Sequence, residues 1–172
     1  MALSFFLAHL SHAGKGPSKE HADSVNVLKN IIVKSNTINS SAVGFAGAPS
    51  NSWYAFAFLA TIATERELLA MTTDRSPVLR LYAYTALLHR KSGDTARVVK
   101  KLSSDHSTVH TLSGCIMNET RVSEAVNDVG IWYYPEALDN FRSSLKDKKY
   151  KHELFQSLKG GKAVQRFVSR GE

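Results

Sequence analysis

Residues 64–88 read TERELLAMTTDRSPVLRLYAYTALL and predict two helices joined by a tight bend. Thr64 and Glu67 form the capping-box pattern, in which each side chain accepts a hydrogen bond from the backbone N–H of the other residue. Ser76 followed by Pro77 predicts a second start, because serine caps a helix well and proline fits the first helical position, where no N–H is needed. The segment therefore predicts an antiparallel helical hairpin.

The bend of this hairpin recurs 31 residues further along the chain. Residues 71–78 (MTTDRSPV) and 102–109 (LSSDHSTV) both place an apolar residue before the turn, an acid within it and a serine where a new helix is expected. Antiparallel helix pairs that repeat about every 30 residues are typical of an α-solenoid, in which each hairpin buries its apolar face against the next. Similar hairpins also occur in plain helical bundles, so the echo alone leaves both architectures open.

The rest of the chain also favours helix almost throughout. Residues 36–52 are the exception, because they are rich in Ser, Asn, Gly and Pro and predict a loop. The other expected helices cover residues 18–34, 53–63 and 95–104, and three more begin at Ser107, Thr120 and Pro135. The predicted fold is a single all-α domain over residues 1–172 with about seven or eight helices. Within it, residues 51–118 form the repeat core and residues 135–172 a basic helical region.

The first hairpin resembles the HEAT-like repeat family. Leu68 and Leu69 lie near the end of its first helix and Asp74 lies in the bend. Residues 77–87 (PVLRLYAYTAL) match the family pattern P-x-[apolar]-R-x-x-A-x-x-A-L. Residues 53–116 are also similar to uncharacterised bacterial HEAT-like proteins. The resemblance implies a short α-solenoid of antiparallel hairpins, and it implies that Arg80 reaches the acid of a turn, either Asp74 or Asp105. In the second unit the arginine, both alanines and the leucine of the pattern are replaced.

Residues with catalytic or metal-binding chemistry are few and do not converge. The single cysteine, Cys115, excludes an internal disulfide and a zinc site built on cysteine pairs, and it is expected to be a buried small apolar residue. The chain has no glycine-rich phosphate loop and no serine in a nucleophile elbow. Asp105, His106 and His110 have the residue types of a metal site, but the bend expected at Ser107 separates the two histidines. Neither a metal nor a cofactor is therefore predicted, and an enzyme acting through His110 and Cys115 is the less favoured alternative.

The sequence favours a non-enzymatic interaction module that binds another macromolecule, in the first place a protein, on the concave face of the solenoid. Tyr82 and Tyr84 lie two residues apart on one helix, so one of them is expected to face solvent. The residues expected to contact the partner are Arg80, Tyr82, Tyr84, Arg90, Arg97, Lys100 and Lys101. Residues 132–135 (WYYP) are expected to anchor the last helix, with a contact patch as the alternative. The sequence does not indicate an oligomeric state.

The alternative function is binding of nucleic acid or another polyanion. The chain has a net charge of +7, and residues 142–172 hold nine Lys or Arg against three acids, which is +6 of that total. Such a tail attracts phosphates with an affinity that depends on salt and not on base sequence. A lysine-rich helix in solvent has the same composition, so the charge by itself does not decide between the two.

The first residues of the chain are apolar. Residues 2–10 (ALSFFLAHL) carry no Lys, Arg, Asp or Glu and precede small and polar residues at 11–14. Residues 1–17 are predicted to hold an N-terminal helix that packs on the first repeat, with a short signal peptide cleaved near residues 11–13 as the alternative. A cytoplasmic location is favoured by the first interpretation and export by the second. No apolar run reaches the roughly 20 residues that span a bilayer.

Overall fold

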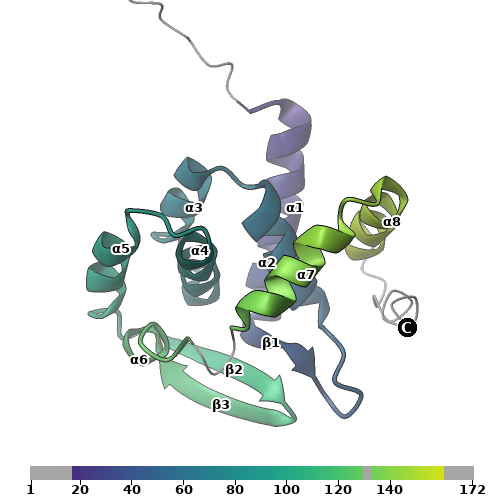
Figure 1. Cartoon of the computed structure of the whole chain (residues 1–172). Coiled ribbons are helices and arrows are strands. Elements are labelled where there is room, and N and C mark those ends of the chain that lie inside the picture. The colour runs from purple at the N-terminus through teal and green to yellow at the C-terminus, as the bar shows by residue number, and fades with distance from the viewer. Residues whose placement is uncertain (1–16, 130–132, 161–172) are drawn as a thin grey trace, which may run out of the picture.

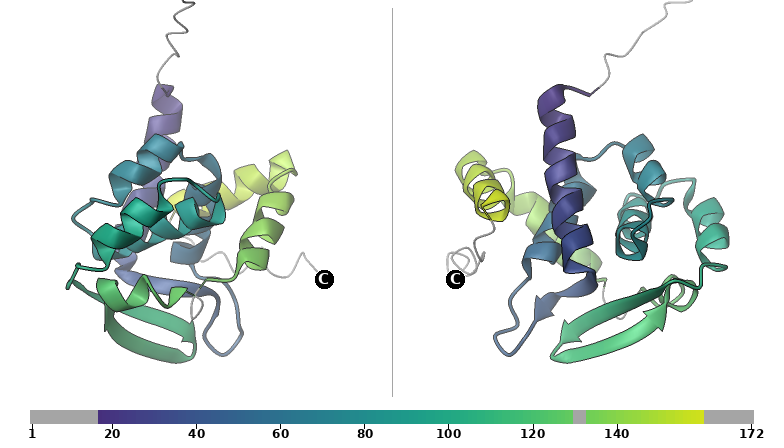
Figure 2. Two further views of the ribbon diagram at one scale, coloured as in Figure 1. Left: turned by 60° about the vertical axis from the view of Figure 1, so that its left-hand side comes forward. Right: turned by 180° about the vertical axis from the view of Figure 1, so that it is seen from behind.

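The computed structural model (Figure 1) describes residues 17–129 and 133–160 and shows a mainly helical protein with one small sheet. The helices are α1 (Lys19–Ser35), α2 (Asn51–Ile62), α3 (Glu65–Met71), α4 (Pro77–His89), α5 (Thr95–Leu102), α6 (Val122–Ala125), α7 (Pro135–Ser144) and α8 (Lys148–Lys159). The strands are β1 (Thr37–Val43), β2 (Thr108–Gly114) and β3 (Ile116–Arg121). In Figures 1 and 2, α3, α4 and α5 gather on one side of α2, α7 and α8 lie on the other, and the sheet closes one end.

This sheet shows that the predicted fold class, an all-α HEAT-like solenoid, is wrong. Its strand order is β1-β2-β3, with β1 parallel to β2 and β2 antiparallel to β3. The chain after Ser107 forms two strands where the echo of the first bend predicts a second helical hairpin. Within residues 51–118, the regular helical hairpin is therefore α3–α4, and α5 leads from it into the sheet.

Local sequence explains why the chain is extended after Ser107. Thr108, Val109 and Thr111 are β-branched, and such side chains favour strands over helices. Gly114 has a φ of +56° and is the first of the two residues that turn the chain between β2 and β3. Glycine favours this position in a two-residue hairpin loop because it reaches a positive φ without steric cost.

The two matching turns do share one geometry. The Asp74 carboxylate accepts a hydrogen bond from the Ser76 N–H at 3.0 Å, and the Asp105 carboxylate accepts one from the Ser107 N–H at 3.0 Å. The first turn is followed by proline and leads into α4, whereas the second is followed by β-branched residues and leads into β2. An Asp-x-Ser turn therefore marks a change of direction, and the residues after it decide between helix and strand.

Strand β1 lies inside the loop predicted over residues 36–52, so that prediction is wrong for Thr37–Val43. Ile38 is fully buried on the sheet, and the Asn39 N–H donates to the Tyr82 hydroxyl at 2.8 Å, which ties β1 to α4. The polar run NSS over residues 39–41 hides the strand, because it lacks the alternation of apolar and polar residues that a half-buried strand shows.

The helical hairpin predicted over residues 64–88 is confirmed as α3 and α4. Thr64 and Glu67 make both hydrogen bonds of the capping box, and Ser76 caps α4 with Pro77 at its start. Helix α4 contacts α1, α2, α3, α5 and α6 as well as β1 and β2, so protein surrounds it.

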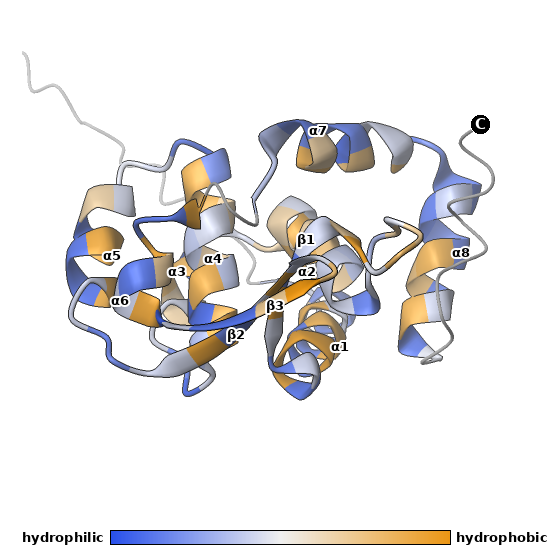
Figure 3. Cartoon of the chain, turned by 90° about the horizontal axis from the view of Figure 1, so that it is seen from below, coloured by the Kyte–Doolittle hydropathy of each residue, from blue (hydrophilic) through white to orange (hydrophobic). Residues whose placement is uncertain are grey.

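The enclosure of α4 corrects the prediction that one of its two tyrosines is exposed. Tyr82 is fully buried and Tyr84 is 5% exposed. Tyr82 and Tyr84 point to different faces of α4, so one of them would be exposed if one face of the helix met solvent. Both are buried because other elements cover every face of α4. Phe56 of α2 stacks on Tyr82 with ring centroids 4.5 Å apart. In Figure 3 the apolar residues of α2 lie in the middle, whereas α5 and α8 at the two edges carry hydrophilic turns.

Arg80 joins the helical hairpin to the start of the sheet. Its guanidinium lies 2.7 Å from the Asp105 carboxylate and donates to the Ser107 hydroxyl at 2.9 Å. It also donates to the carbonyls of Asp74 and Arg75, at 2.7 and 3.0 Å. The expectation that Arg80 reaches the acid of a turn is thus confirmed, at Asp105.

This ion pair makes the stability of the fold depend on pH. Burial raises the pKa of Asp105, but hydrogen bonds from Ser107 and the charge and hydrogen bond of Arg80 outweigh it, so the pKa lies below its ordinary value. A carboxyl whose pKa is lower in the folded chain stabilises the fold above the unfolded pKa of about 4, and this stabilisation is lost as the pH falls through the folded pKa. We expect Asp105→Asn to be less stable at pH 7 and to lose less stability than wild type between pH 7 and pH 3, as measured by thermal unfolding. Asp128→Asn, at an exposed position, should keep the wild-type pH dependence.

Aromatic rings fix α7 to the body of the protein. The ring of Phe141 lies edge-on to Trp53 and to Phe58, with centroids 5.7 and 5.3 Å apart, and it also contacts Tyr54. Such contacts between rings add to the stabilisation that comes from burying their apolar area.

His89 contacts both α7 and the residues that precede it. His89, at the end of α4, has Nδ1 2.5 Å from the Tyr133 hydroxyl and Nε2 3.2 Å from the Asp139 carboxylate. Burial and the neighbouring acids Asp139 and Glu136 raise the pKa of Tyr133 to about 12, so its hydroxyl keeps its proton near neutral pH. Of the aromatic anchor expected at residues 132–135, Tyr133 makes these contacts, Tyr134 is 45% exposed, and Trp132 lies outside the described residues.

Candidate functional site

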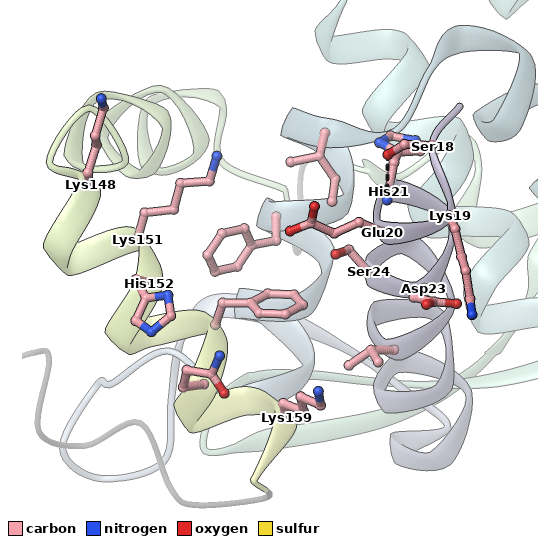
Figure 4. Close-up of a pocket in the computed structure, with 15 residues that line it drawn as sticks. Ser18, Lys19, Glu20, His21, Asp23, Ser24, Lys148, Lys151, His152 and Lys159 are labelled. Carbon is pink, nitrogen blue, oxygen red and sulfur yellow. Dashed lines mark hydrogen bonds between the residues drawn. The ribbon is translucent and has the colours of Figure 1, made fainter. Parts of the chain in front are cut away.

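A groove of about 980 Å³ lies between the first half of α1 and α8 (Figure 4). Its floor is apolar and is formed by three helices. The floor residues are Val27 of α1, Phe58 and Ile62 of α2, and Phe155 of α8. The remaining lining residues are polar or charged and form two walls, one on α1 and one on α8.

Helix α2 explains why the groove forms. Both α1 and α8 pack on α2, and Phe155 of α8 meets Phe58 edge-on with ring centroids 5.9 Å apart. Figures 1 and 2 show α1 and α8 on separate sides of α2, and the groove is lined by residues of all three helices.

Side-chain caps fix where each wall begins. The Ser18 hydroxyl accepts a hydrogen bond from the His21 N–H at 3.2 Å and starts α1. The Asp147 carboxylate accepts hydrogen bonds from the N–H groups of Lys149 and Tyr150, at 2.8 and 3.2 Å, and starts α8. Because side chains three or four residues apart share one face of a helix, each start also decides which side chains face the groove.

The two walls carry opposite charges. On the α1 wall the Glu20 carboxylate points toward the space between the walls, whereas Lys19 and Asp23 extend on the side of α1 away from α8 (Figure 4). The α8 wall carries only basic or neutral polar side chains. They are Lys148, Lys151, His152, Gln156 and Lys159. In Figure 4, Glu20 and Lys151 point from their helices toward the space between the walls. Opposed walls of this kind favour a ligand that has an apolar face and flanks of opposite charge.

A hydrogen bond between α1 and α3 holds the rim of the groove on the α1 side. His21 Nε2 lies 3.0 Å from the Glu67 carboxylate. Burial raises the pKa of Glu67, but hydrogen bonds from His21 and from the N–H and hydroxyl of Thr64 outweigh it, so the pKa lies below its ordinary value. Glu67 therefore stays ionised at neutral pH and keeps the first turn of α1 against α3.

The contact residues predicted on α4 have structural partners instead of a shared surface. Arg80 is held by the turns described above, and Tyr82 and Tyr84 are buried. Arg90 donates from Nε and from one terminal nitrogen to the Ala60 carbonyl, at 3.1 and 2.6 Å. Burial, with the nearby charge of Arg142, lowers the pKa of Arg90.

The other predicted contact residues lie on α5. Lys100 and Lys101 are exposed, and Arg97, whose side chain is 73% exposed, pairs with Asp94 at 2.6 Å. Helix α5 is on the opposite side of the molecule from α8 in both Figure 1 and Figure 2. The predicted set is therefore divided between buried positions and one outer helix, and a role of the α5 residues in binding stays a prediction.

Cys115 is exposed in the turn between β2 and β3, so the prediction that it is buried is wrong. His110 lies on β2, opposite Glu119 of β3, with a distance of 3.8 Å between their side chains. Over residues 17–129 and 133–160, no group of three or more His, Cys, Asp or Glu is placed to hold a metal ion.

The groove is not predicted from the sequence. In each of its two walls, however, the residues that line it follow the spacing of a single helical face. On α1, positions 20, 23, 24 and 27 line the groove, and on α8, positions 148, 151, 152, 155, 156 and 159 do so. Both sets follow the spacing of one helical face. The sequence does not show that these faces meet across α2, since residues near position 20 and residues near position 150 are far apart in the chain.

Comparison with known proteins identifies no relative of this chain among family models and curated proteins. No protein-family model matches the sequence, and no curated protein matches it significantly. Among the described residues, no helix combines the length and the apolar character needed to cross a membrane.

Proposed function

We propose that this protein is a non-enzymatic interaction module that binds an amphipathic helix of a protein partner in the groove between α1 and α8. The observation that supports the proposal is the combination of an apolar floor with two walls of opposite charge. In helix-in-groove recognition, apolar residues at positions i, i+3, i+4 and i+7 of the ligand enter an apolar trough, while polar residues stay at its edges.

The size of the groove suits a short helix. The α1 wall runs over residues 18–27, which at 1.5 Å per residue is about 15 Å. A ligand helix of about ten residues has the same length and presents two to three turns to the floor. Four apolar side chains on one face of such a helix match the apolar part of the lining, where Phe58 and Ile62 belong to the same helix.

The charges of the walls predict how the ligand lies. A basic flank would face Glu20, and an acidic flank would face Lys148 and Lys151. Charges at the edge of an interface act mainly on orientation and association rate, and salt weakens them.

A charge reversal on α8 tests this proposal. The ligand is a fluorescein-labelled model helix of about sixteen residues, with leucines on one face, arginines along one flank and glutamates along the other. We expect Lys151→Glu to weaken binding about fivefold at low salt, because it places an acid opposite the acidic flank, and we expect the difference to shrink at high salt. Fluorescence anisotropy with the full chain measures both effects.

Lys149→Glu is the matched control, because it makes the same charge change on the same helix. The Lys149 side chain is 80% exposed and is not among the residues that line the groove. Its affinity should stay within about twofold of wild type. Equal losses in the two variants would mean that the peptide senses only the net charge, and no binding to any of these proteins would refute the proposal.

Binding of a polyanion is the second candidate function. It is supported by Lys148, Lys149, Lys151 and Lys159 on a single helix, within the part of the chain that carries most of the net charge. A labelled DNA duplex in the same assay distinguishes the two candidates. Duplex binding that falls steeply with salt, and that Lys149→Glu and Lys151→Glu weaken equally, would favour the polyanion.

A further inference from the structure

The described chain begins at residue 17, next to the rim of the groove, and the apolar residues 2–10 (ALSFFLAHL) precede it in the sequence. Ser18, which caps α1, is one of the residues that line the groove. The segment contains two phenylalanines and three leucines, and it has no Lys, Arg, Asp or Glu. Such a segment gains free energy when it leaves water for an apolar surface, at roughly 25 cal/mol per Å² of apolar area buried.

The connection between this segment and α1 allows it to turn back. Residues 11–17 (SHAGKGP) include Gly14, Gly16 and Pro17, which are residue types that favour turns. Helix–helix connections of two to eight residues commonly join antiparallel neighbours whose axes lie about 8–10 Å apart. As a helix, residues 2–10 would be about 13.5 Å long, which is close to the length of about 15 Å of the α1 wall.

We propose that residues 2–10 bind in the groove between α1 and α8 as an intramolecular ligand, antiparallel to α1, with Phe5 and Phe6 on the partly exposed floor residues Ile62 and Phe155. The segment then competes with the partner helix for one site. The competition rests on the proposed function, whereas occupation of the groove by the segment does not.

The other end of the chain fits the groove less well. Residues 161–172 follow α8 and carry Lys162, Arg166 and Arg170 against a single acid, Glu172, so they would bring a net charge of +2 to the basic wall. Like charges at close range repel each other, whereas residues 2–10 add no formal charge to either wall.

Tethering makes even weak binding effective. A ligand on a short flexible connection has an effective concentration in the millimolar range. If the free segment has a dissociation constant of about 0.1 mM, the tethered segment fills the groove about ten times as often as it leaves it empty.

A competition experiment with the full chain tests the proposal. We expect Phe5→Asp combined with Phe6→Asp to release the segment and to tighten binding of the model helix about tenfold relative to wild type. The control combines Ser11→Asp with His12→Asp, which adds the same two charges in the connection and should leave the affinity within about twofold of wild type.

Disulfide formation detects occupation of the groove without any partner. In the Cys115→Ser background, Ala8→Cys is combined either with Gln156→Cys, which lines the groove, or with Lys101→Cys on α5. We expect the first pair to form an intramolecular disulfide at least tenfold faster in oxidised glutathione, as followed by mass spectrometry. Phe5→Asp with Phe6→Asp should remove this difference.

The outcomes separate the two proposals. Equal disulfide rates in the two pairs, with equal affinity of wild type and the Phe5→Asp/Phe6→Asp variant for the model helix, would overturn the intramolecular ligand and leave the proposed function standing. Fast disulfide formation at position 156 with no peptide binding to any variant would uphold occupation of the groove and refute the proposed function.

Discussion

Replacement of Arg80 by alanine is expected to lower the free energy of unfolding by about 3 kcal/mol, which is a large part of the stability of an ordinary domain. Only 12% of the Arg80 side chain and 18% of the Asp105 side chain are exposed, so the variant leaves a largely buried carboxylate without its partner. The variant also removes the hydrogen bonds that Arg80 donates to the Ser107 hydroxyl and to two backbone carbonyls. Unpaired buried groups of this kind cost more than the net contribution of the bonds that held them.

Urea unfolding followed by circular dichroism measures this loss. Arg97→Ala is the matched control, because its ion pair with Asp94 lies within a single helical turn and 73% of the arginine side chain is exposed. The control should lose less than about 0.5 kcal/mol. A similar small loss for Arg80→Ala would mean that Arg80 does not join the helical hairpin to the sheet.

Replacement of Phe141 by alanine is expected to cost about 3–4 kcal/mol and to loosen α7 and α8 before the rest of the protein. The Phe141 side chain is 6% exposed and contacts the rings of Trp53, Tyr54 and Phe58, so its removal leaves a cavity between α7 and α2. Native-state hydrogen exchange should show faster exchange of α7 and α8 amides, with little change in α4.

Phe155→Ala is the control for this prediction. Phe155 is only half-buried and meets Phe58 from the edge of the groove, so its loss should cost about 1.5 kcal/mol. If Phe141→Ala leaves exchange of α8 unchanged, the wall of the groove does not depend on the ring contacts of α7.

Local chemistry decides which parts of the fold can be predicted from the sequence. The start of α3 at Thr64 and of α4 at Ser76 follows from hydrogen bonds between residues three positions apart, and both predictions are confirmed. The strand Thr37–Val43 escapes prediction because its partner lies far along the chain and its middle is polar. The exposure of Cys115 likewise depends on a hairpin that the apparent helical repeat conceals.

The groove could not be predicted from local sequence patterns, because it depends on how distant helices pack together. The acidic face of α1 and the basic face of α8 are each visible as a helical spacing. Their meeting depends on how both helices pack on Phe58 and its neighbours in α2, which no local pattern encodes. Charge and aromatic character predict Arg80, Tyr82, Tyr84 and Arg90 as contact residues, and the structure places all four in internal contacts.

The parallel pairing of β1 with β2 also has a consequence for the time course of synthesis. Strand β1 ends at Val43, and β2 begins 65 residues later at Thr108. At the usual 5–20 residues per second, β1 leaves the ribosome about 3 to 13 s before the strand that pairs with it. Helices α2 to α5 have time to fold in this interval, while the edge of β1 has no neighbour. The polar residues Asn39, Ser40 and Ser41 make that waiting strand a poor nucleus for aggregation, so the composition that conceals β1 in the sequence protects it during translation.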